Sequence, residues 1–241
     1  MAGLTADWLK ERPIAHRGLH DGNAAVFENS MSAFQAAIDA GYAIECDVHL
    51  SADRVPVVFH DENLERLTGS AGSIRARSAD ALSALRLGSS SDTIPSLADL
   101  LALVRGQVPL IVELKGIDPA SDQGFVGTVA AVAQDYNGPL AFMSFDHWLL
   151  EQSDDLRGLY PLGLTAEGIR PEILDAHRRI FDGRCDFTSY NVHHLPNAFV
   201  DWVRTERGAP VISWTVRTPD EVERSSLHAD QMTFEGFTPP R

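Results

Sequence analysis

The sequence predicts an α/β fold, a (β/α)₈ TIM barrel with a β-hairpin after its second strand. Short apolar runs alternate with helix-length segments along most of the 241 residues. Such alternation is typical of parallel strands joined by helical crossovers. Eight of the nine runs suit a parallel sheet, and eight strands close a barrel of this type. We expect residues 1–241 to form one such domain, with a short insertion at about 69–93.

The expected strands are apolar runs bounded by turn residues. They are Arg12–His16, Ala43–Leu50, Val55–His60, Leu110–Leu114, Leu140–Phe145, Leu159–Thr165, Cys185–Tyr190, Pro210–Val216 and Gln231–Glu235. The expected helices are Ser30–Ala40, Ser96–Val104, Gly124–Ala133, His147–Gln152, Pro171–Ile180, Pro196–Glu206 and Pro219–Ser226. The segment 69–93 is rich in Ser, Gly and Ala, and we expect a loop there with one short helix at Ala79–Leu87. Such an insertion is either a lid or a surface excursion.

One pair of strands breaks the alternation. Only the four residues of Ser51–Arg54 separate the second run from the third. A parallel crossover needs a dozen or more residues, so Val55–His60 is predicted to return antiparallel as a hairpin arm. The competing architecture is an open doubly wound sheet. No Gly-x-Gly-x-x-Gly turn follows the first strand, which disfavours that alternative.

Composition excludes several classes of protein. Hydrophobic content of 44% and charged content of 22% are those of a globular protein. The net charge is −14 and no Lys/Arg run is present, so nucleic-acid binding is not expected. The first ten residues lack a signal-peptide core, and no stretch approaches the roughly 18 apolar residues of a membrane span. Cys46 and Cys185 make no disulfide framework, so we expect a cytoplasmic protein without stable membrane insertion.

Carboxylates stand on two otherwise apolar strands. Glu45 and Asp47 point to the same side of one strand, because side chains alternate between faces. Glu113 follows the apolar pair Ile111 and Val112 on the next barrel strand. Polar residues at the carboxyl ends of barrel strands face the active-site mouth, so the three carboxylates should converge. Their mutual repulsion calls for a hard divalent cation with oxygen ligands, Mg²⁺, Ca²⁺ or Mn²⁺.

Histidines and cationic side chains surround this predicted metal site. His16 and Arg17 end the first strand, and His60 ends the hairpin. Lys115 shares a strand face with Glu113. Arg and Lys suit phosphate oxygens, and paired histidines suit general acid–base catalysis because their pKa lies near neutral pH. The pattern predicts metal-assisted phosphoryl transfer.

Several sequence blocks occur together in one order. They are His16-Arg17-Gly18, Glu28-Asn29-Ser30, Glu45-Cys46-Asp47-Val48-His49-Leu50, Pro56-Val57-Val58-Phe59-His60-Asp61, Leu64-Glu65-Arg66-Leu67-Thr68-Gly69, Ile94-Pro95-Ser96-Leu97, Glu113-Leu114-Lys115 and Trp214-Thr215-Val216. In this combination the chain resembles the glycerophosphodiester phosphodiesterase family. The resemblance runs from about Pro13 to the C-terminus and is densest before Leu67.

The resemblance implies a barrel that hydrolyses a small-molecule glycerophosphodiester to glycerol 3-phosphate and an alcohol, with one divalent cation as cofactor. It implies His16 and His60 as the acid/base pair without assigning the two roles, Glu45, Asp47 and Glu113 as metal ligands, Arg17 as a catalytic and phosphate-binding residue, Lys115 as a second phosphate-binding residue, and Trp214 in the pocket wall. The head group and the oligomeric state stay open. A lysophospholipase D-like phosphodiesterase and a non-catalytic glycerophosphodiester-binding protein are the alternatives.

Three stretches depart from the family pattern. Ser51–Arg54 replaces a Thr-x-Asp-Gly turn, Arg217 replaces an Asn, and Ala229–Glu235 replaces the usual final strand. Because the last strand ends at the mouth, we expect these changes to affect the choice of alcohol and not the core chemistry. We expect His49 at the rim of the mouth. Glu28 and Asn29 precede a helix, and we expect Asn29 or Ser30 to cap it, with a direct role of Glu28 and Asn29 in the site as the alternative.

Overall fold

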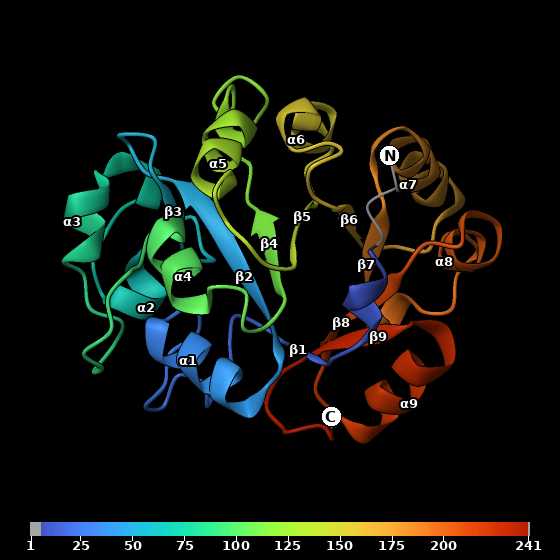
Figure 1. The fold of residues 1–241 in the computed structure, drawn as a ribbon, viewed down its shortest axis with the longest axis horizontal. Coiled ribbons are helices and arrows are strands. Elements are labelled where there is room, and N and C mark those ends of the chain that lie inside the picture. Colours follow the sequence, from blue (N-terminus) through green and yellow to red (C-terminus); the bar gives the residue numbers. More distant parts are fainter. Residues whose placement is uncertain (1–5, 241) are drawn as a thin grey trace.

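A closed barrel of eight parallel strands forms the centre of the molecule in the computed structural model, which describes residues 6–240 (Figure 1). The barrel strands are β1 (Ile14–Ala15), β2 (Ala43–Leu50), β4 (Leu110–Leu114), β5 (Leu140–Ser144), β6 (Leu162–Ala166), β7 (Phe187–Asn191), β8 (Val211–Val216) and β9 (Gln231–Phe234). They pair in this order, and β1 closes the ring by pairing in parallel with both β2 and β9. The predicted barrel is confirmed.

The third strand, β3 (Pro56–Val58), lies outside the ring. It pairs antiparallel with the far end of β2, where Val48 faces Val58 and Leu50 faces Pro56. The tight connection allows no crossover, so the chain reverses and returns toward the barrel mouth. The predicted hairpin is therefore confirmed, and it carries His60 back to the end of the barrel that holds Asp47.

Helices cover the outside of the barrel (Figure 1). They are α1 (Met31–Ala40), α4 (Leu97–Val104), α5 (Phe125–Ala133), α6 (His147–Glu151), α7 (Pro171–Arg184), α8 (Ala198–Trp202) and α9 (Pro219–His228). Ser30, Ser96 and Thr218 cap α1, α4 and α9 with side-chain hydroxyls that accept from backbone N–H groups. These helices match the predicted ones to within a few residues, except that α8 ends early and continues as a π-helix at Val203–Arg207.

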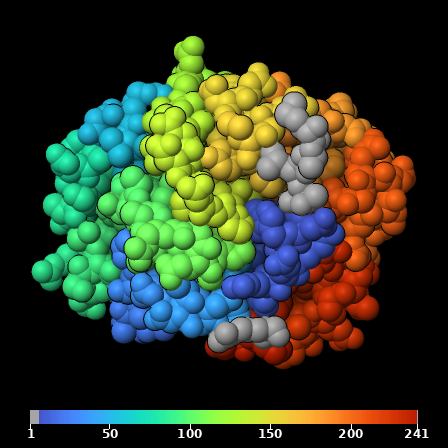
Figure 2. Space-filling model, in the orientation of Figure 1, coloured from blue at the N-terminus to red at the C-terminus, as the bar shows by residue number. Residues whose placement is uncertain are grey.

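An apolar layer closes the amino end of the barrel. Ile14, Ile111, Phe187 and Ile212 point inward from their strands, and Leu9 packs against them from a 3₁₀-helix at Asp7–Lys10. Figure 2 shows this N-terminal segment in blue, seated among the green, orange and red parts of the chain. Because this layer seals the amino end, the open end of the barrel is the carboxyl end, where the polar side chains gather.

The insertion forms a small satellite core beside β3. It follows α2 (Glu65–Thr68) and contains a 3₁₀-helix at Ile74–Ala76 and α3 (Ala79–Ser83), which is shorter than the predicted Ala79–Leu87. Ile74 and Leu82 are buried against Phe59. No residue from 69 to 93 lines the cavity at the mouth in the described part of the chain. The insertion is therefore a packed surface excursion and not a lid.

Several predicted strands are shorter than expected. The first keeps only Ile14–Ala15, and the hairpin arm predicted at Val55–His60 keeps only Pro56–Val58. The sixth begins at Leu162 instead of Leu159 because the chain first turns through Leu156–Tyr160, and the seventh begins at Phe187 instead of Cys185. None of the helices that the structure describes is long and apolar enough to cross a membrane. The prediction that residues 1–241 form one domain stays a prediction, since residues 1–5 and 241 lie outside the described range.

Candidate active site

A cavity of about 210 Å³ opens at the carboxyl end of the barrel. All eight side chains that the sequence singles out line it: His16, Arg17, Glu45, Asp47, His60, Glu113, Lys115 and Trp214. They come from five different strands and loops, so only barrel closure brings them together. The cavity adds lining residues that the sequence did not predict, namely Met143, Phe145, Thr165, Ser189, Asn191, His193, Thr215, Arg217 and Thr233.

Three carboxylates meet on one side of this cavity. Asp47 of β2 and Glu113 of β4 are register partners in neighbouring parallel strands, and Glu45 lies two residues before Asp47 on the same face. One carboxylate oxygen from each lies within 4.8 Å of the others. All three residues are buried. Buried oxygen donors at this spacing are the ligand type that hard divalent cations prefer.

The electrostatics of the carboxylates fit a cation. Burial, followed by the charges of Asp47 and Glu113, raises the pKa of Glu45 well above its usual value. Burial also raises the pKa of Glu113, in spite of the charge of Lys115. Burial opposes ionisation of Asp47 too, but the charges of Lys115 and Arg17 outweigh it and hold the Asp47 pKa below its usual range. Three carboxylates against two cationic side chains leave excess negative charge, which a bound divalent cation would neutralise.

Lys115 and Arg17 lie against these carboxylates. Lys115 Nζ is 2.9 Å from Oδ1 of Asp47 and also contacts Glu113. Arg17 Nε is 3.2 Å from Oδ2 of Asp47, and the Arg17 backbone N–H donates to Glu45 Oε2 at 3.0 Å. Arg17 adopts a φ of 55°, in the left-handed region that non-glycine residues rarely occupy. This turn lets one residue contact two carboxylates, with its backbone and its side chain.

Asn29 belongs to the site and does not cap the helix. Its Nδ2 donates to Oδ2 of Asp47 at 2.8 Å, and its backbone N–H donates to the carbonyl of Arg17 at 2.9 Å. Its φ of 54° is again left-handed. The cap of α1 is Ser30, whose Oγ accepts from the N–H of Ala33. The sequence left both roles open for Asn29, and the contact with Asp47 decides between them.

His16 is held by a carboxylate from the last strand's end. Its Nδ1 lies 2.7 Å from Oε2 of Glu235, which also accepts from Arg217 at 2.9 Å. The hydrogen bond with His16 lowers the pKa of Glu235 to about 2, so this carboxylate is ionised and can only accept. Nδ1 of His16 therefore carries the proton, and Nε2 is left with its lone pair. The expectation that the departures at Arg217 and Glu235 leave the core chemistry alone was wrong.

His60 has the same arrangement. Its Nδ1 lies 2.8 Å from Oδ1 of Asp61, and Asp61 in turn accepts from Arg66 at 2.6 and 2.8 Å. His49 Nε2 lies 3.0 Å from the backbone carbonyl of His60. His49 is buried behind His60, so the prediction that it lies at the rim was wrong. Burial lowers the pKa of His60, and burial lowers that of His16 to about 4, so the geometry gives two neutral imidazoles facing one cavity.

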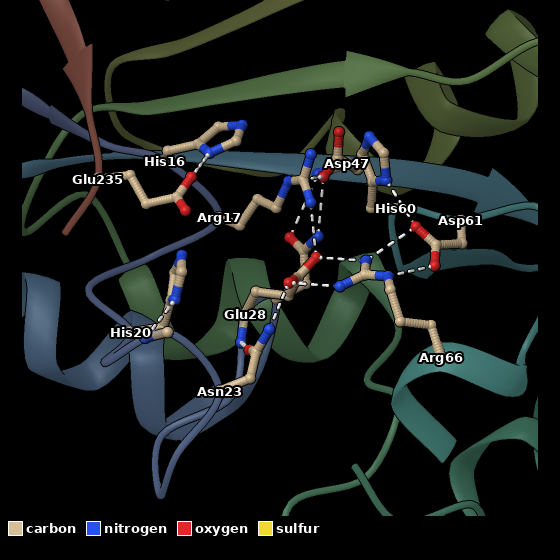
Figure 3. A network of polar contacts seen from close by, with 12 residues as sticks. His16, Arg17, His20, Asn23, Glu28, Asp47, His60, Asp61, Arg66 and Glu235 are labelled. Atoms are coloured by element: carbon tan, nitrogen blue, oxygen red, sulfur yellow. Dashed lines mark hydrogen bonds and ion pairs between the residues drawn. The ribbon is translucent and has the colours of Figure 1, made fainter. Parts of the chain in front are cut away.

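Glu28 links Arg17, which contacts the carboxylate cluster, to Arg66, which contacts the carboxylate beside His60 (Figure 3). It accepts from Arg17 at 2.6 Å, from Arg66 at 2.8 and 2.9 Å, and from Asn23 at 2.7 Å. Burial alone would raise the pKa of Glu28, but the hydrogen bond from Arg66 and the charge of Arg17 outweigh it and hold the pKa well below its usual value. Glu28 acts through Arg17 and Arg66 and does not line the cavity.

The opposite wall of the cavity is largely aromatic. Trp214 and Phe145 pack edge to face with ring centroids 5.3 Å apart, and the Trp214 indole N–H donates to the carbonyl of Ser189 at 3.0 Å. Lys115 Nζ lies 5.9 Å from the centre of the Phe145 ring. The carboxylates, Arg17 and Lys115 thus come from β1, β2, β4 and the residues directly after them, whereas β5 to β8 contribute mainly uncharged side chains, with Arg217 after β8 and His193 after β7 as exceptions.

Several functional contacts escaped the sequence analysis. Glu235 and Asp61 each contact a predicted histidine, and Arg66 contacts both Glu28 and Asp61. Asp61 could have been found from its position directly after His60. Glu235 has no such local signal, because its partner His16 lies 219 positions away.

Comparisons with known proteins agree with this geometry. Residues 16–232 match the model of the glycerophosphoryl diester phosphodiesterase family. The chain is 31% identical over 218 residues to Bacillus subtilis YhdW, covering 84% of this chain and 85% of that one. It is 27% identical over 232 residues to the glycerophosphodiester phosphodiesterase of Caldanaerobacter subterraneus subsp. tengcongensis, with 90% of each covered. A solved phosphodiesterase from Oleispira antarctica, in complex with the product sn-glycerol-3-phosphate, superposes with a TM-score of 0.81 at 23% identity over 95% of both chains.

Replacing Glu28 by Gln should destabilise the fold in a pH-dependent way. The buried carboxylate loses its charge toward Arg17 and Arg66, which we expect to cost about 2–4 kcal/mol of unfolding free energy at pH 7. Since the pKa of Glu28 is depressed in the folded state, its stabilisation is complete above the unfolded value of about 4.3 and is lost as the pH falls below it. Denaturant unfolding of wild type and variant between pH 7 and 3 measures this difference.

The matched control is Glu172→Gln, whose partner Arg170 is exposed. A surface pair of this kind contributes little, so the control should unfold like wild type. A Glu28→Gln penalty that stays constant from pH 7 to 3 would contradict the electrostatic origin.

Proposed function

The chain belongs to the glycerophosphoryl diester phosphodiesterase family, and we propose that it hydrolyses glycerophosphodiesters to glycerol 3-phosphate and an alcohol. One observation carries the proposal. Two imidazoles, two cationic side chains and three carboxylates line a single cavity at the carboxyl end of a barrel. That set supports charge neutralisation at a phosphate and proton transfer on both sides of it.

Glu45, Asp47 and Glu113 are the proposed ligands of one divalent cation, Mg²⁺, Ca²⁺ or Mn²⁺. When bound, such a cation supplies positive charge beside a phosphoryl oxygen. The excess negative charge of the three buried carboxylates supports this role, as does their all-oxygen donor set. Asn29 and the backbone N–H of Arg17 donate hydrogen bonds to Asp47 and Glu45, which orient these two proposed ligands.

Arg17 and Lys115 are the proposed phosphate-binding residues. Both are held beside Asp47 and are already desolvated, so little reorganisation is needed when an anion arrives. Glu28, which does not line the cavity, accepts a 2.6 Å hydrogen bond from the Arg17 guanidinium and holds it in place. Arg17 is thereby directed at the substrate, which supports its assignment to both the catalytic and the phosphate-binding set.

His16 and His60 are the proposed acid/base pair. Each keeps Nδ1–H on a carboxylate, Glu235 or Asp61, and each leaves Nε2 free for proton transfer. Before the reaction one of the two histidines takes up a second proton, from solvent, on Nε2. The neutral Nε2 of the other then takes a proton from the attacking water, while the protonated histidine donates its Nε2 proton to the departing alcohol oxygen. The P–O bond to the alcohol breaks as the new P–O bond forms, so charge and protons balance.

A panel of glycerophosphodiesters tests the proposed activity and cofactor together. We expect glycerol 3-phosphate release from glycerophosphocholine or a related diester when Mg²⁺, Mn²⁺ or Ca²⁺ is present. Chelation with EDTA should abolish release, and adding back one of these cations should restore it. Full activity in protein shown to contain no metal would refute the cofactor, and absence of release from every diester would refute the reaction.

Replacing His16 or His60 by Ala should lower kcat by roughly 10²–10⁴-fold each, the usual contribution of general acid–base catalysis. The double variant should be little worse than the poorer single one, since residues acting as a unit are not additive. His228→Ala is the control, because His228 lies in the last turn of α9 away from the cavity. A substrate with a p-nitrophenol leaving group should restore activity only to the variant that lost the acid. Wild-type activity in either variant removes that histidine from the mechanism.

A second candidate function is lysophospholipase D-like cleavage of a lysophospholipid, and one observation favours it. Ile117, Phe145 and Ile169, exposed by 41%, 37% and 61%, lie within three residues of the carboxyl ends of β4, β5 and β6. Phe145 lines the cavity, and because the other two lie in the adjacent loops at the same end of the barrel, we infer that the three form an apolar rim on one side of the mouth. No local pattern in the sequence predicts this rim, because its three side chains follow three separate strands. An apolar rim beside a phosphodiesterase site suits an acyl chain that extends out of the cavity.

The double variant Ile117→Ser/Ile169→Ser tests the rim. It should lower kcat/KM for lysophosphatidylcholine about tenfold or more and leave glycerophosphocholine hydrolysis unchanged, because only the first substrate has an acyl chain. The matched control is Leu159→Ser/Leu227→Ser, which removes two exposed apolar side chains away from the mouth. Equal effects of both double variants on lysophosphatidylcholine, or no turnover of it by wild type, would rule this candidate out.

A further inference from the structure

Two buried hydroxyls in the cavity wall have no hydrogen-bond partner. They are Thr165 Oγ1 on β6 and Ser189 Oγ on β7, and both residues line the cavity. Thr165 is 2% exposed and Ser189 is 1% exposed. Among the described residues, they are the two hydroxyl groups that are buried and unpaired. An unpaired buried hydroxyl is unfavourable in a folded protein, so a persistent one requires an explanation.

Strand geometry directs both side chains at the cavity. Thr165 and Ser189 are register partners in neighbouring parallel strands, so they lie side by side. Along β7, Phe187 points into the barrel layer, whereas Thr188 and Tyr190 point outward to the helices, which leaves Ser189 pointing inward. Thr188 shows the normal case, because its Oγ1 donates to the carbonyl of Leu164 at 2.8 Å.

The pair lies across the barrel from the charged side. In the closed ring β1, β2, β4, β5, β6, β7, β8, β9, strand β6 stands opposite β1 and β7 stands opposite β2. Thr165 and Ser189 therefore face Arg17 and Asp47 across the cavity. When the phosphate of a ligand lies at the charged side, the part of the ligand farthest from phosphorus reaches this wall.

The side chains of this wall indicate which part of the substrate binds there. The neighbours of the wall include the aromatic side chains Phe145 and Trp214 and the apolar Met143, and the nearest charged lining residue, Arg217 after β8, is paired with Glu235. Hydroxyls both donate and accept, and a partner that does both is another hydroxyl. Glycerol attached to phosphate carries its terminal hydroxyl at the far end of its carbon chain.

We propose that Thr165 and Ser189 form a subsite that hydrogen-bonds the terminal hydroxyl of the substrate's glycerol. This inference rests on the proposed glycerophosphodiester hydrolysis and names the residues that select glycerol. The hydroxyls are unpaired without substrate because their partner belongs to the substrate. They bind and do not take part in bond breaking.

The test compares two substrates on three proteins. The substrates are glycerophosphocholine and its analogue lacking only the terminal hydroxyl, propane-1,2-diol phosphocholine. Choline has no hydroxyl here, so any difference reports on glycerol. Wild type should have a kcat/KM about tenfold or more higher for glycerophosphocholine than for the analogue, because the analogue leaves the hydroxyls of Thr165 and Ser189 without a hydrogen-bond partner. Thr165→Val/Ser189→Ala should lose that preference by slowing the parent about tenfold while the analogue is unchanged.

Thr188→Val is the matched control on the same strand. It removes a buried hydroxyl that has a protein partner, so it should lower Tm and keep the substrate preference. The subsite variant should show the opposite pattern, an equal or higher Tm with the preference lost, because it removes polar groups that are unpaired in the free protein. A purely structural role for Thr165 and Ser189 would move Tm and not the preference.

The outcomes separate the two proposals. If wild type hydrolyses glycerophosphocholine but the subsite variant keeps its preference over the analogue, the subsite is wrong and the proposed function stands. Equal slowing of both substrates also overturns the subsite. If wild type hydrolyses neither, calorimetric binding of glycerol 3-phosphate against propane-1,2-diol 1-phosphate replaces turnover as the readout. Loss of that binding preference in the variant supports the subsite, and an unchanged preference overturns it.

Discussion

The repulsion between three buried carboxylates is the constraint on which the rest of the site depends. Glu45, Asp47 and Glu113 lie on strands that are buried on both faces, where isolated negative charges are costly. Lys115 and Arg17 offset part of that cost. Asn29 donates a hydrogen bond to Oδ2 of Asp47 at 2.8 Å, closer than the 3.2 Å contact of Arg17 with the same oxygen. Two left-handed residues, Arg17 and Asn29, are tolerated because they aim these groups at the carboxylates.

Charges alternate outward from this centre toward His60. Asp47 contacts Arg17, Arg17 contacts Glu28, and Glu28 contacts Arg66. Arg66 then contacts Asp61, which holds Nδ1 of His60. Each charge is flanked by opposite ones, so the low dielectric of the barrel end strengthens the series instead of opposing it. The orientation of His60 is thereby linked to the carboxylate cluster through side chains from the segment 16–66.

His16 is held by a separate group at the other side of the mouth. Glu235 and Arg217 come from the ends of β9 and β8, the region where the sequence departs most from the family pattern. Arg217 and Glu235 hold His16 in the same way as Arg66 and Asp61 hold His60, although the two sets of residues are unrelated in sequence. In both cases a carboxylate that is bound by an arginine fixes the imidazole tautomer. Two unrelated segments thus provide the same support for two histidines that face one cavity.

The sequence alone determined the barrel, the hairpin and seven of the eight residues first assigned to the site, whereas Trp214 was assigned from the family resemblance. Those features depend on local patterns, namely strand–helix alternation, a connection too short for a crossover, and polar residues at the ends of apolar strands. Tertiary structure alone decided the partners of the histidines, the burial of His49, the apolar rim and the unpaired hydroxyls of β6 and β7. The physical reason is that hydrogen bonds and burial depend on which distant side chains meet when the ring closes, and a pattern read along one strand does not contain that information.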